Sequence, residues 1–188
     1  FLKSVPQKAF RITKYESAPL SEILRHTLQH SDNQAAELVL MQIGGKLGGD
    51  AAQGLSKVQK WLRAFGISEE ALMIRNGSGL YGGSAGSATA VTKMLVKIHQ
   101  NRSSGADFLA GLAVPGRPGT MENRLKHLPR GSIRGKTGTL NEVSSLCGYA
   151  LGREQKTAFC VLANSIRKGH LGAARELQDR VAETLTQQ

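Results

Sequence analysis

The sequence has little cysteine, few aromatic residues and no long apolar run. Two cysteines among 188 residues exclude a disulfide framework and a cysteine-rich metal centre. No apolar run approaches the ~18 residues of a membrane span, so no transmembrane segment is predicted. Aromatic residues make up only 5% of the chain and include a single tryptophan, which argues against a platform for stacking nucleic-acid bases.

Acidic residues are also scarce, because 14 Asp and Glu stand against 25 Lys and Arg, for a net charge of +11. A basic surface attracts polyanions. Here, however, Lys and Arg are scattered along the chain, so we predict no nucleic-acid partner. Two explanations of the charge stay open. Either a more acidic part of the parent protein lies outside these residues, or the surface attracts an anionic cell-wall polymer.

The two cysteines fall at matching places in a predicted hairpin over residues 144–164. Pairing Leu151 with Lys156 across the turn at 152–155 places Cys147 directly opposite Cys160. Directly opposed strand positions suit disulfide geometry poorly, so free thiols are expected in preference to a bridge.

Apolar periodicity predicts helices in the first two thirds of the chain and strands after residue 131. Ser17 and Pro19 are expected to open the first helix, with Ser17 as its cap. The glycine-rich stretch 76–87 is expected to be a loop near a ligand. Helices first and strands last predict an α+β domain. The expected helices are 18–30, 33–44, 51–65, 88–98, 105–112, 121–128 and 169–186, and the expected strands are 132–139, 144–151 and 156–164.

Two short motifs carry chemistry. Ser31-Asp32-Asn33 lies between two predicted helices, and Lys136-Thr137-Gly138-Thr139 lies on the first late strand. Ser-x-Asn and Lys-Thr-Gly are two of the three active-site motifs of penicillin-binding proteins and class A β-lactamases; the third, Ser-x-x-Lys, supplies the nucleophile. Each motif alone is weak evidence, but their order and contexts agree. If both serve one ligand, Ser31 and Lys136 should lie close together.

Further blocks extend the resemblance over residues 17–186. They are Ser17–Ile23 leading into His30–Asn33, Asn76-Gly77-Ser78-Gly79-Leu80, Gly119-Thr120-Met121, and Lys136–Asn141 followed by Gly148-Tyr149. In this order they resemble the D-alanyl-D-alanine carboxypeptidases of the penicillin-binding-protein 4 type, serine peptidase family S13. The resemblance implies a β-lactamase/penicillin-binding-protein transpeptidase-like fold that is incomplete here, with a helical region, antiparallel strands and a C-terminal covering helix. Residues 17–188 would form the C-terminal part of the transpeptidase domain, and residues 1–16 the tail of an upstream inserted domain.

The resemblance also implies acyl transfer through a serine acyl-enzyme. Ser31 would relay a proton toward the leaving amine with help from Lys136, and the Asn33 amide would bind the substrate backbone. Thr137, Gly138 and Thr139 would hold the substrate, with the Thr139 N–H as an oxyanion donor. The implied partners are peptidoglycan stem peptides ending in D-Ala-D-Ala and, in the full-length parent, β-lactam antibiotics, in the periplasm or another extracytoplasmic space. No cofactor or metal is implied, and the five histidines have no metal-ligand spacing.

The nucleophile motif is the main departure from that family. The only Ser-x-x-Lys is Ser165–Lys168, which follows the Lys-Thr-Gly strand at a strand end and is rejected as nucleophile. The chain alone is therefore predicted to be inactive. Structural alternatives stay open, in which Ser31 or Asp32 only caps a helix and Gly138 only relieves crowding between strands.

Two other functions stay open. One is a class A β-lactamase, whose general base usually lies in Glu-x-x-Leu-Asn, whereas Glu69–Met73 here ends in methionine. The other is a non-catalytic relative that binds peptidoglycan peptides.

Overall fold

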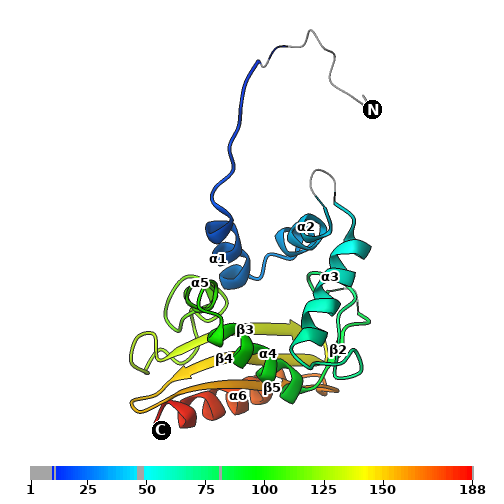
Figure 1. Cartoon of the computed structure of the whole chain (residues 1–188). Helices are drawn as coiled ribbons and strands as arrows, with labels where there is room; N and C mark the ends of the chain where they lie inside the picture. Colours follow the sequence, from blue (N-terminus) through cyan, green and yellow to red (C-terminus); the bar gives the residue numbers. More distant parts are fainter. Residues whose placement is uncertain (1–9, 11, 46–48, 81, 188) are drawn as a thin grey trace.

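The computed structural model describes residues 10, 12–45, 49–80 and 82–187. Its helices are α1 (Leu20–His30), α2 (Asn33–Gly44), α3 (Ala51–Ala64), α4 (Ala88–Gln100), α5 (Gly105–Gly111) and α6 (Leu171–Thr186). Its strands are β1 (Leu72–Met73), β2 (Ala85–Gly86), β3 (Ile133–Leu140), β4 (Val143–Leu151) and β5 (Lys156–Ala163). The expected α+β class is confirmed, because the helices α1 to α5 precede the long strands β3 to β5 and the helix α6 follows them (Figure 1).

The sheet is antiparallel with the strand order β3-β4-β5, and helices cover both of its faces. Leu146 and Phe159 pack with Ala182 of α6, whereas Tyr149 packs with Leu95 of α4. Alternate residues of a strand point to opposite faces, so one strand supplies both cores. In Figure 1 the helices α1, α2, α3 and α5 lie above this sheet, and β3 is the strand beside them.

Most expected helices form, and two cap residues act as predicted. Asp50 Oδ1 accepts from the Ala52 N–H at 2.9 Å, and Ser87 Oγ accepts from the Ala90 N–H at 3.1 Å. Ser17 does not cap α1; Pro19 holds the N-cap position, and the Ser17 hydroxyl donates to the carbonyl of Ala18. A proline at the cap moves the first turn beyond the reach of Ser17.

The helix expected at 121–128 is absent, and turns replace it. Arg124 N–H donates to Met121 O, and Leu128 N–H donates to Leu125 O, each closing a four-residue turn. Leu125 has φ of 51°, and a residue in the left-handed region cannot continue a right-handed helix. Burial of Met121 and Leu125 in the core produced the helix-like spacing.

The hairpin register is as predicted, but the cysteines are not free. Leu151 pairs with Lys156 and Cys147 with Cys160, and the two cysteines form a disulfide. The expectation of free thiols is therefore wrong. Their Cα atoms lie only 3.9 Å apart, shorter than the ~4.5 Å of an ordinary close antiparallel pair, and this approach brings the sulfur atoms together.

The covering helix α6 buries a polar residue at its centre. Gln178 and Ala182 are fully buried, whereas Leu177 is 49% exposed. The Gln178 amide donates to the Ser144 hydroxyl at 3.0 Å, which satisfies two buried polar groups on β4 and α6. A polar residue thus takes the central core position because it has a buried partner.

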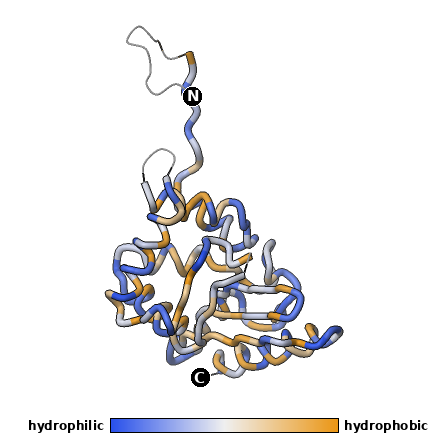
Figure 2. Tube along the Cα trace, turned by 90° about the vertical axis from the view of Figure 1, so that its right-hand side faces the viewer, coloured by the Kyte–Doolittle hydropathy of each residue, from blue (hydrophilic) through white to orange (hydrophobic). Residues whose placement is uncertain are grey.

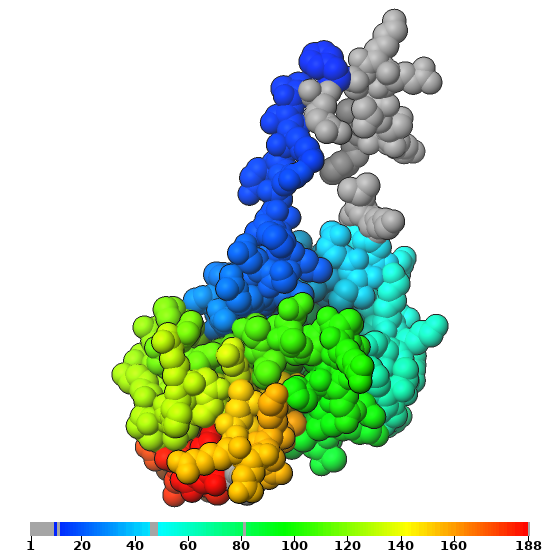
Figure 3. Space-filling model, turned by 60° about the vertical axis from the view of Figure 1, so that its left-hand side comes forward, coloured from blue at the N-terminus to red at the C-terminus, as the bar shows by residue number. Residues whose placement is uncertain are grey.

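The chain before α1 has no regular structure over residues 12–19. Figure 3 shows this part, in dark blue, rising from the surface of α1. Of the segment expected to be the tail of an inserted domain, residues 1–9 and 11 lie outside the described residues. Among the described residues, none of the helices has the length and apolar character to cross a membrane.

Candidate active site

Ser31 lies in the sharp turn between α1 and α2. It is the C-cap of α1 with φ of 58° and ψ of 49°, an uncommon left-handed conformation for a residue with a side chain. The next residue, Asp32, starts α2, because its Oδ1 accepts from the Ala35 N–H at 3.0 Å. Asp32 therefore has the structural role expected for it, and the turn leaves the Ser31 hydroxyl free to point away from both helices.

Lys136 projects from the middle of β3 to this turn. Its Nζ donates to Ser31 Oγ at 2.7 Å and to the carbonyl of Thr137 at 2.7 Å. The two residues are 105 positions apart in the chain, so only the tertiary fold brings them together. The Ser-x-Asn and Lys-Thr-Gly motifs thus meet through their first residues.

Burial lowers the pKa of the Lys136 ammonium from its usual value, because desolvation disfavours the charged form. Among the described residues no carboxylate pairs with the ammonium to offset this effect, since both of its acceptors, Ser31 Oγ and the Thr137 carbonyl, are neutral oxygens. A lysine with a lowered pKa gives up its proton more readily than one in water. The Lys136–Ser31 pair is therefore suited to moving a proton.

The rest of the second motif follows Lys136 toward the exposed end of β3. Gly138 pairs with Ser145 of β4, and a Cβ at Gly138 would collide with the Ser145 hydroxyl. The Ser145 hydroxyl would have to rotate away to make room for such a Cβ. Thr139 is exposed, and its hydroxyl accepts from the Arg175 guanidinium of α6 at 3.3 Å. Arg175 was not predicted from the sequence, since nothing in the pattern of α6 marks it.

Asn33 is the first residue of α2, and its side chain is exposed. One turn later, Glu37 accepts hydrogen bonds from Gly77 and Ser78 of the glycine-rich loop. Sequence reasoning missed Glu37, although its place four residues after Asn33 puts both side chains on one helix face. A carboxylate four residues after Asn33 was therefore the feature of the sequence that could have indicated Glu37 as a residue of the site.

The block Gly119-Thr120-Met121 packs against the end of α1. The Thr120 N–H donates to the Gln29 carbonyl at 2.9 Å, and a Cβ at Gly119 would crowd the same carbonyl. Arg124, which follows this block, pairs with Asp179 of α6 at 2.8 Å. Within the described residues, no three His, Cys, Asp or Glu side chains gather as ligands for a metal.

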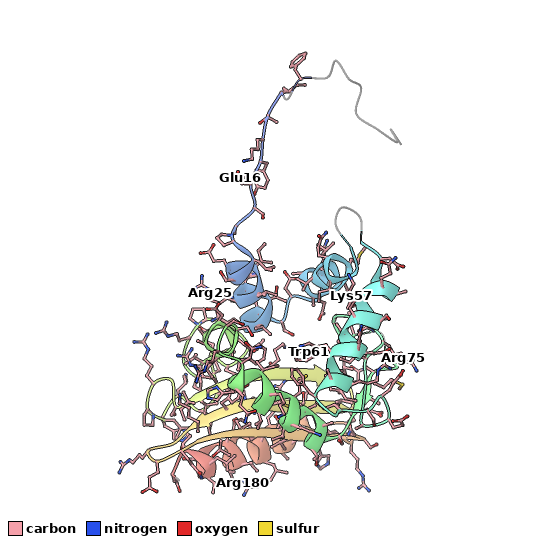
Figure 4. All side chains as sticks on the ribbon, viewed as in Figure 1. Glu16, Arg25, Lys57, Trp61, Arg75 and Arg180 are labelled. Carbon is pink, nitrogen blue, oxygen red and sulfur yellow. A yellow bond between two sulfur atoms is a disulfide. The ribbon has the colours of Figure 1, made fainter. Side chains whose placement is uncertain are left out.

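A hollow of about 640 Å³ opens beside the Ser31 turn, between α1, α2, α3 and α5. It adjoins that turn, because Thr27, which lines it, accepts from the Asp32 N–H. Figure 2 shows apolar positions recurring along the upper helices, and Figure 4 shows Trp61 on the side of α3 that faces this space. Apolar side chains dominate its lining, among them Leu24, Leu28, Val39, Ile43, Trp61 and Phe108.

The description "D-Ala-D-Ala carboxypeptidase 3 (S13) family" belongs to the family model that matches this chain, over residues 1–188. The chain belongs to this family. A D-alanyl-D-alanine carboxypeptidase of Actinomadura sp. (strain R39) is 32% identical over 189 residues, covering 96% of this chain and 34% of that protein. The chain therefore spans about one third of the length of this S13 relative.

Solved structures show the same fold. Penicillin-binding protein 4 of Haemophilus influenzae, in complex with a β-lactam, has a TM-score of 0.78 at 22% identity over 100% of this chain and 46% of its own. A predatory endopeptidase of Bdellovibrio bacteriovorus has a TM-score of 0.72 at 19% identity over 96% and 48%. A β-lactamase of Chitinophaga pinensis has a TM-score of 0.70 at 16% identity over 89% and 64%. The expected penicillin-binding-protein and β-lactamase fold is thus confirmed.

Proposed function

We propose that this chain is the C-terminal part of a serine-type D-Ala-D-Ala carboxypeptidase or endopeptidase that acts on peptidoglycan stem peptides. The contact of 2.7 Å between Lys136 Nζ and Ser31 Oγ carries the proposal, because it joins two motifs that are 105 residues apart. Membership of the S13 family supports the same function. The nucleophile of the parent comes from a Ser-x-x-Lys segment outside these 188 residues.

In the proposed reaction, that serine hydroxyl attacks the carbonyl carbon before the terminal D-alanine. Its proton reaches the nitrogen of the departing D-alanine through the Ser31 hydroxyl, while Lys136 holds Ser31 in place. The C–N bond breaks, D-alanine leaves, and water hydrolyses the acyl-enzyme. The Asn33 amide binds the substrate backbone, and the Thr139 N–H donates to the oxyanion.

Lys136 and the hydroxyls of Thr137 and Thr139 bind the terminal carboxylate in this proposal. Fixed positive charge and hydroxyl donors are the groups that a carboxylate needs. β-Lactams would occupy the same place in the full-length parent, as the β-lactam complex of the penicillin-binding-protein 4 relative suggests by analogy. Because peptidoglycan lies outside the cytoplasm, the proposed location is periplasmic or extracytoplasmic.

The apolar hollow fits the domain assignment, with residues 1–16 as the tail of an inserted domain and 17–188 as part of the transpeptidase domain. Two of the side chains that line the hollow are exposed to solvent, Leu20 at 63% and Trp61 at 41%. A folded domain rarely exposes so large an apolar surface unless another part of the protein covers it. Within the described residues, the buried Thr120 Oγ1 and Arg134 Nε also have no hydrogen-bond partner. We propose that upstream chain of the parent fills the hollow and brings the nucleophile to Ser31.

Intact-mass spectrometry after incubation with benzylpenicillin tests this proposal. The 188-residue chain should keep its mass, because Ser31 is assigned here as a proton relay and these residues hold no Ser-x-x-Lys motif at the start of a helix to supply the nucleophile and its lysine. The parent with its upstream segment should gain one penicilloyl group on that segment. An adduct on Ser31 or Ser165 of the isolated chain would overturn the assignment of the nucleophile.

A parent that binds stem peptides without hydrolysing them would instead be the non-catalytic relative. A parent that releases hydrolysed penicillin rapidly would be a β-lactamase, the activity named for the relative of Chitinophaga pinensis. Release of D-alanine from a D-Ala-D-Ala peptide separates both outcomes from the proposed carboxypeptidase.

A further inference from the structure

The carboxylate of Glu37 on α2 makes three short hydrogen bonds to the loop 76–80. Its Oε1 accepts from the Ser78 N–H at 2.9 Å and from the Ser78 hydroxyl at 2.6 Å. Its Oε2 accepts from the Gly77 N–H at 3.0 Å. Two adjacent backbone amides and a hydroxyl therefore converge on one side chain that is 40 positions away in the sequence.

The loop is built to approach α2 closely. A Cβ at Gly77 would lie 2.5 Å from the Ala36 carbonyl oxygen, so only glycine fits there. The loop also holds its own shape, because Asn76 Oδ1 accepts from the Gly79 N–H at 2.5 Å and Ser78 Oγ accepts from the Leu80 N–H at 3.2 Å. It is thus a preformed turn docked on the helix.

The docking point lies next to the first motif. Glu37 follows Asn33 by four residues, so the two side chains stand on the same face of α2, one helical turn apart. Asp32 caps the helix and fixes where Asn33 stands. A loop held by Glu37 is therefore held beside the amide of Asn33.

The hydrogen bonds also decide the charge of the carboxyl group. The Ser78 hydroxyl, and then the Gly77 and Ser78 amides, lower the pKa of Glu37 against the opposing effect of burial. The group is a carboxylate at neutral pH, and hydrogen bonds to an ionised acceptor are stronger than those to a neutral one. A neutral amide of the same size would keep the shape and lose that strength.

We propose that Glu37 is a positioning residue, which docks the loop 76–80 beside Asn33 and makes the loop a wall of the substrate cleft. This inference rests on the proposed function, because it takes Asn33 as the contact to the substrate backbone. A loosened loop would weaken capture of the substrate and leave the chemical step nearly unchanged. Weaker substrate capture with a nearly unchanged chemical step would identify a wall of the cleft, whereas a contact that only stabilises the fold would not change substrate capture alone.

The docking itself is tested in the 188-residue chain by hydrogen–deuterium exchange. In Glu37→Gln, the amides of residues 77 and 78 should exchange at least about tenfold faster, the effect of losing about 1.4 kcal/mol of protection, while β5 keeps its rate. Glu70→Gln is the matched control, because the pKa of Glu70 is also lowered by a serine, Ser68, but from within its own turn. Unchanged exchange in Glu37→Gln overturns the proposal.

The role in the cleft is tested in the full-length parent with benzylpenicillin. Glu37→Gln should lower the second-order acylation rate about tenfold through weaker binding, with a similar limiting rate at saturation. Ser78→Ala should have a smaller effect, and little further loss should follow when it is added to Glu37→Gln. A wild-type parent that acylates while its Glu37→Gln variant acylates equally well refutes the cleft role alone. A wild-type parent that never acylates refutes the proposed function and the cleft role together, while exchange still reports on the docking.

Discussion

Lys136 combines two properties that a residue chosen for stability would not have. In the part of the chain that the structure describes, it is partly buried without a carboxylate partner, and its ammonium contacts the hydroxyl of a serine held in a left-handed conformation. Burial of a charge opposed only by neutral oxygens costs free energy of folding. Such a cost at a motif residue is the expected sign of function.

The first prediction at the residue scale concerns turnover. In the full-length parent, Lys136→Ala should lower kcat/KM for a D-Ala-D-Ala peptide at least about 100-fold, since solvent cannot replace a fixed charge in the cleft. Lys156→Ala, at the exposed start of β5, is the control and should keep normal turnover. Near-normal turnover of Lys136→Ala would remove Lys136 from the mechanism.

The second prediction concerns the protonation of Lys136 in the isolated chain. Its pKa is lowered, so its ammonium should lose its proton at a lower pH than exposed lysines do. Because the folded pKa of Lys136 lies below its unfolded pKa, the unfolded chain binds more protons at pH values between the two. The contribution of Lys136 to the free energy of unfolding therefore increases as the pH rises through this range. A ¹³C NMR titration of lysine Cε signals, assigned with Lys136→Arg, measures this order. A Lys136 signal that titrates together with those of the surface lysines would contradict the lowering of the Lys136 pKa by burial.

At the scale of elements, the hairpin β4–β5 supports the strand that bears Lys136. Lys136 pairs with Cys147 on β4, and Cys147 pairs with Cys160 on β5. One row across the sheet thus holds the catalytic candidate and the disulfide. Packing of α4 and α6 on the two faces fixes the position of this row.

The third prediction concerns this disulfide. Its reduction should lower the free energy of unfolding by about 2 to 3 kcal/mol, because the crosslink restricts the unfolded chain between two cysteines that are 13 positions apart. Urea unfolding with and without reductant measures the difference, and Cys147→Ala/Cys160→Ala should match the reduced wild type.

Thiol titration of the unfolded chain supplies the independent check. Without reductant it should detect no free thiol, and after reduction it should detect both cysteines of the sequence. Two reactive thiols in the unreduced chain would show that Cys147 and Cys160 are free, as expected from the sequence, and would contradict the disulfide.

At the scale of the whole molecule, the apolar hollow sets this chain apart from a domain with a closed core. The cores around the sheet are well buried, whereas Leu20, Leu38 and Trp61 stay exposed around α1, α2 and α3. The apolar side chains near the sheet are thus buried, whereas those near the proposed position of the nucleophile are exposed.

The fourth prediction uses Trp61, the only tryptophan of this sequence. If upstream chain fills the hollow, Trp61 fluorescence should move to shorter wavelength in the parent, and quenching by acrylamide should fall. The difference between wild type and Trp61→Phe isolates this signal in each protein. Equal emission and equal quenching in the chain and the parent would show that the hollow stays open.

The sequence by itself determined the helices with caps, the three long strands and the hairpin register. These features follow from local preferences, namely the apolar period, the turn residues and the side chains that cap helix ends. It also pointed to the family, since Ser31-Asp32-Asn33 and Lys136-Thr137-Gly138 are local motifs whose order along the chain can be read directly.

Only the tertiary structure decided which distant groups meet. The bonds from Glu37 to the loop, the disulfide and the buried pair of Gln178 with Ser144 all join separate elements, and none of them was predicted, whereas the proximity of Lys136 and Ser31 was expected from the two motifs. The turns at 121–128 belong with them, because burial in the core mimicked a helical period there. Sequence periodicity reports whether a residue is apolar, but the packing of whole elements fixes which atoms lie opposite it, and that is decided by the free energy of the complete fold.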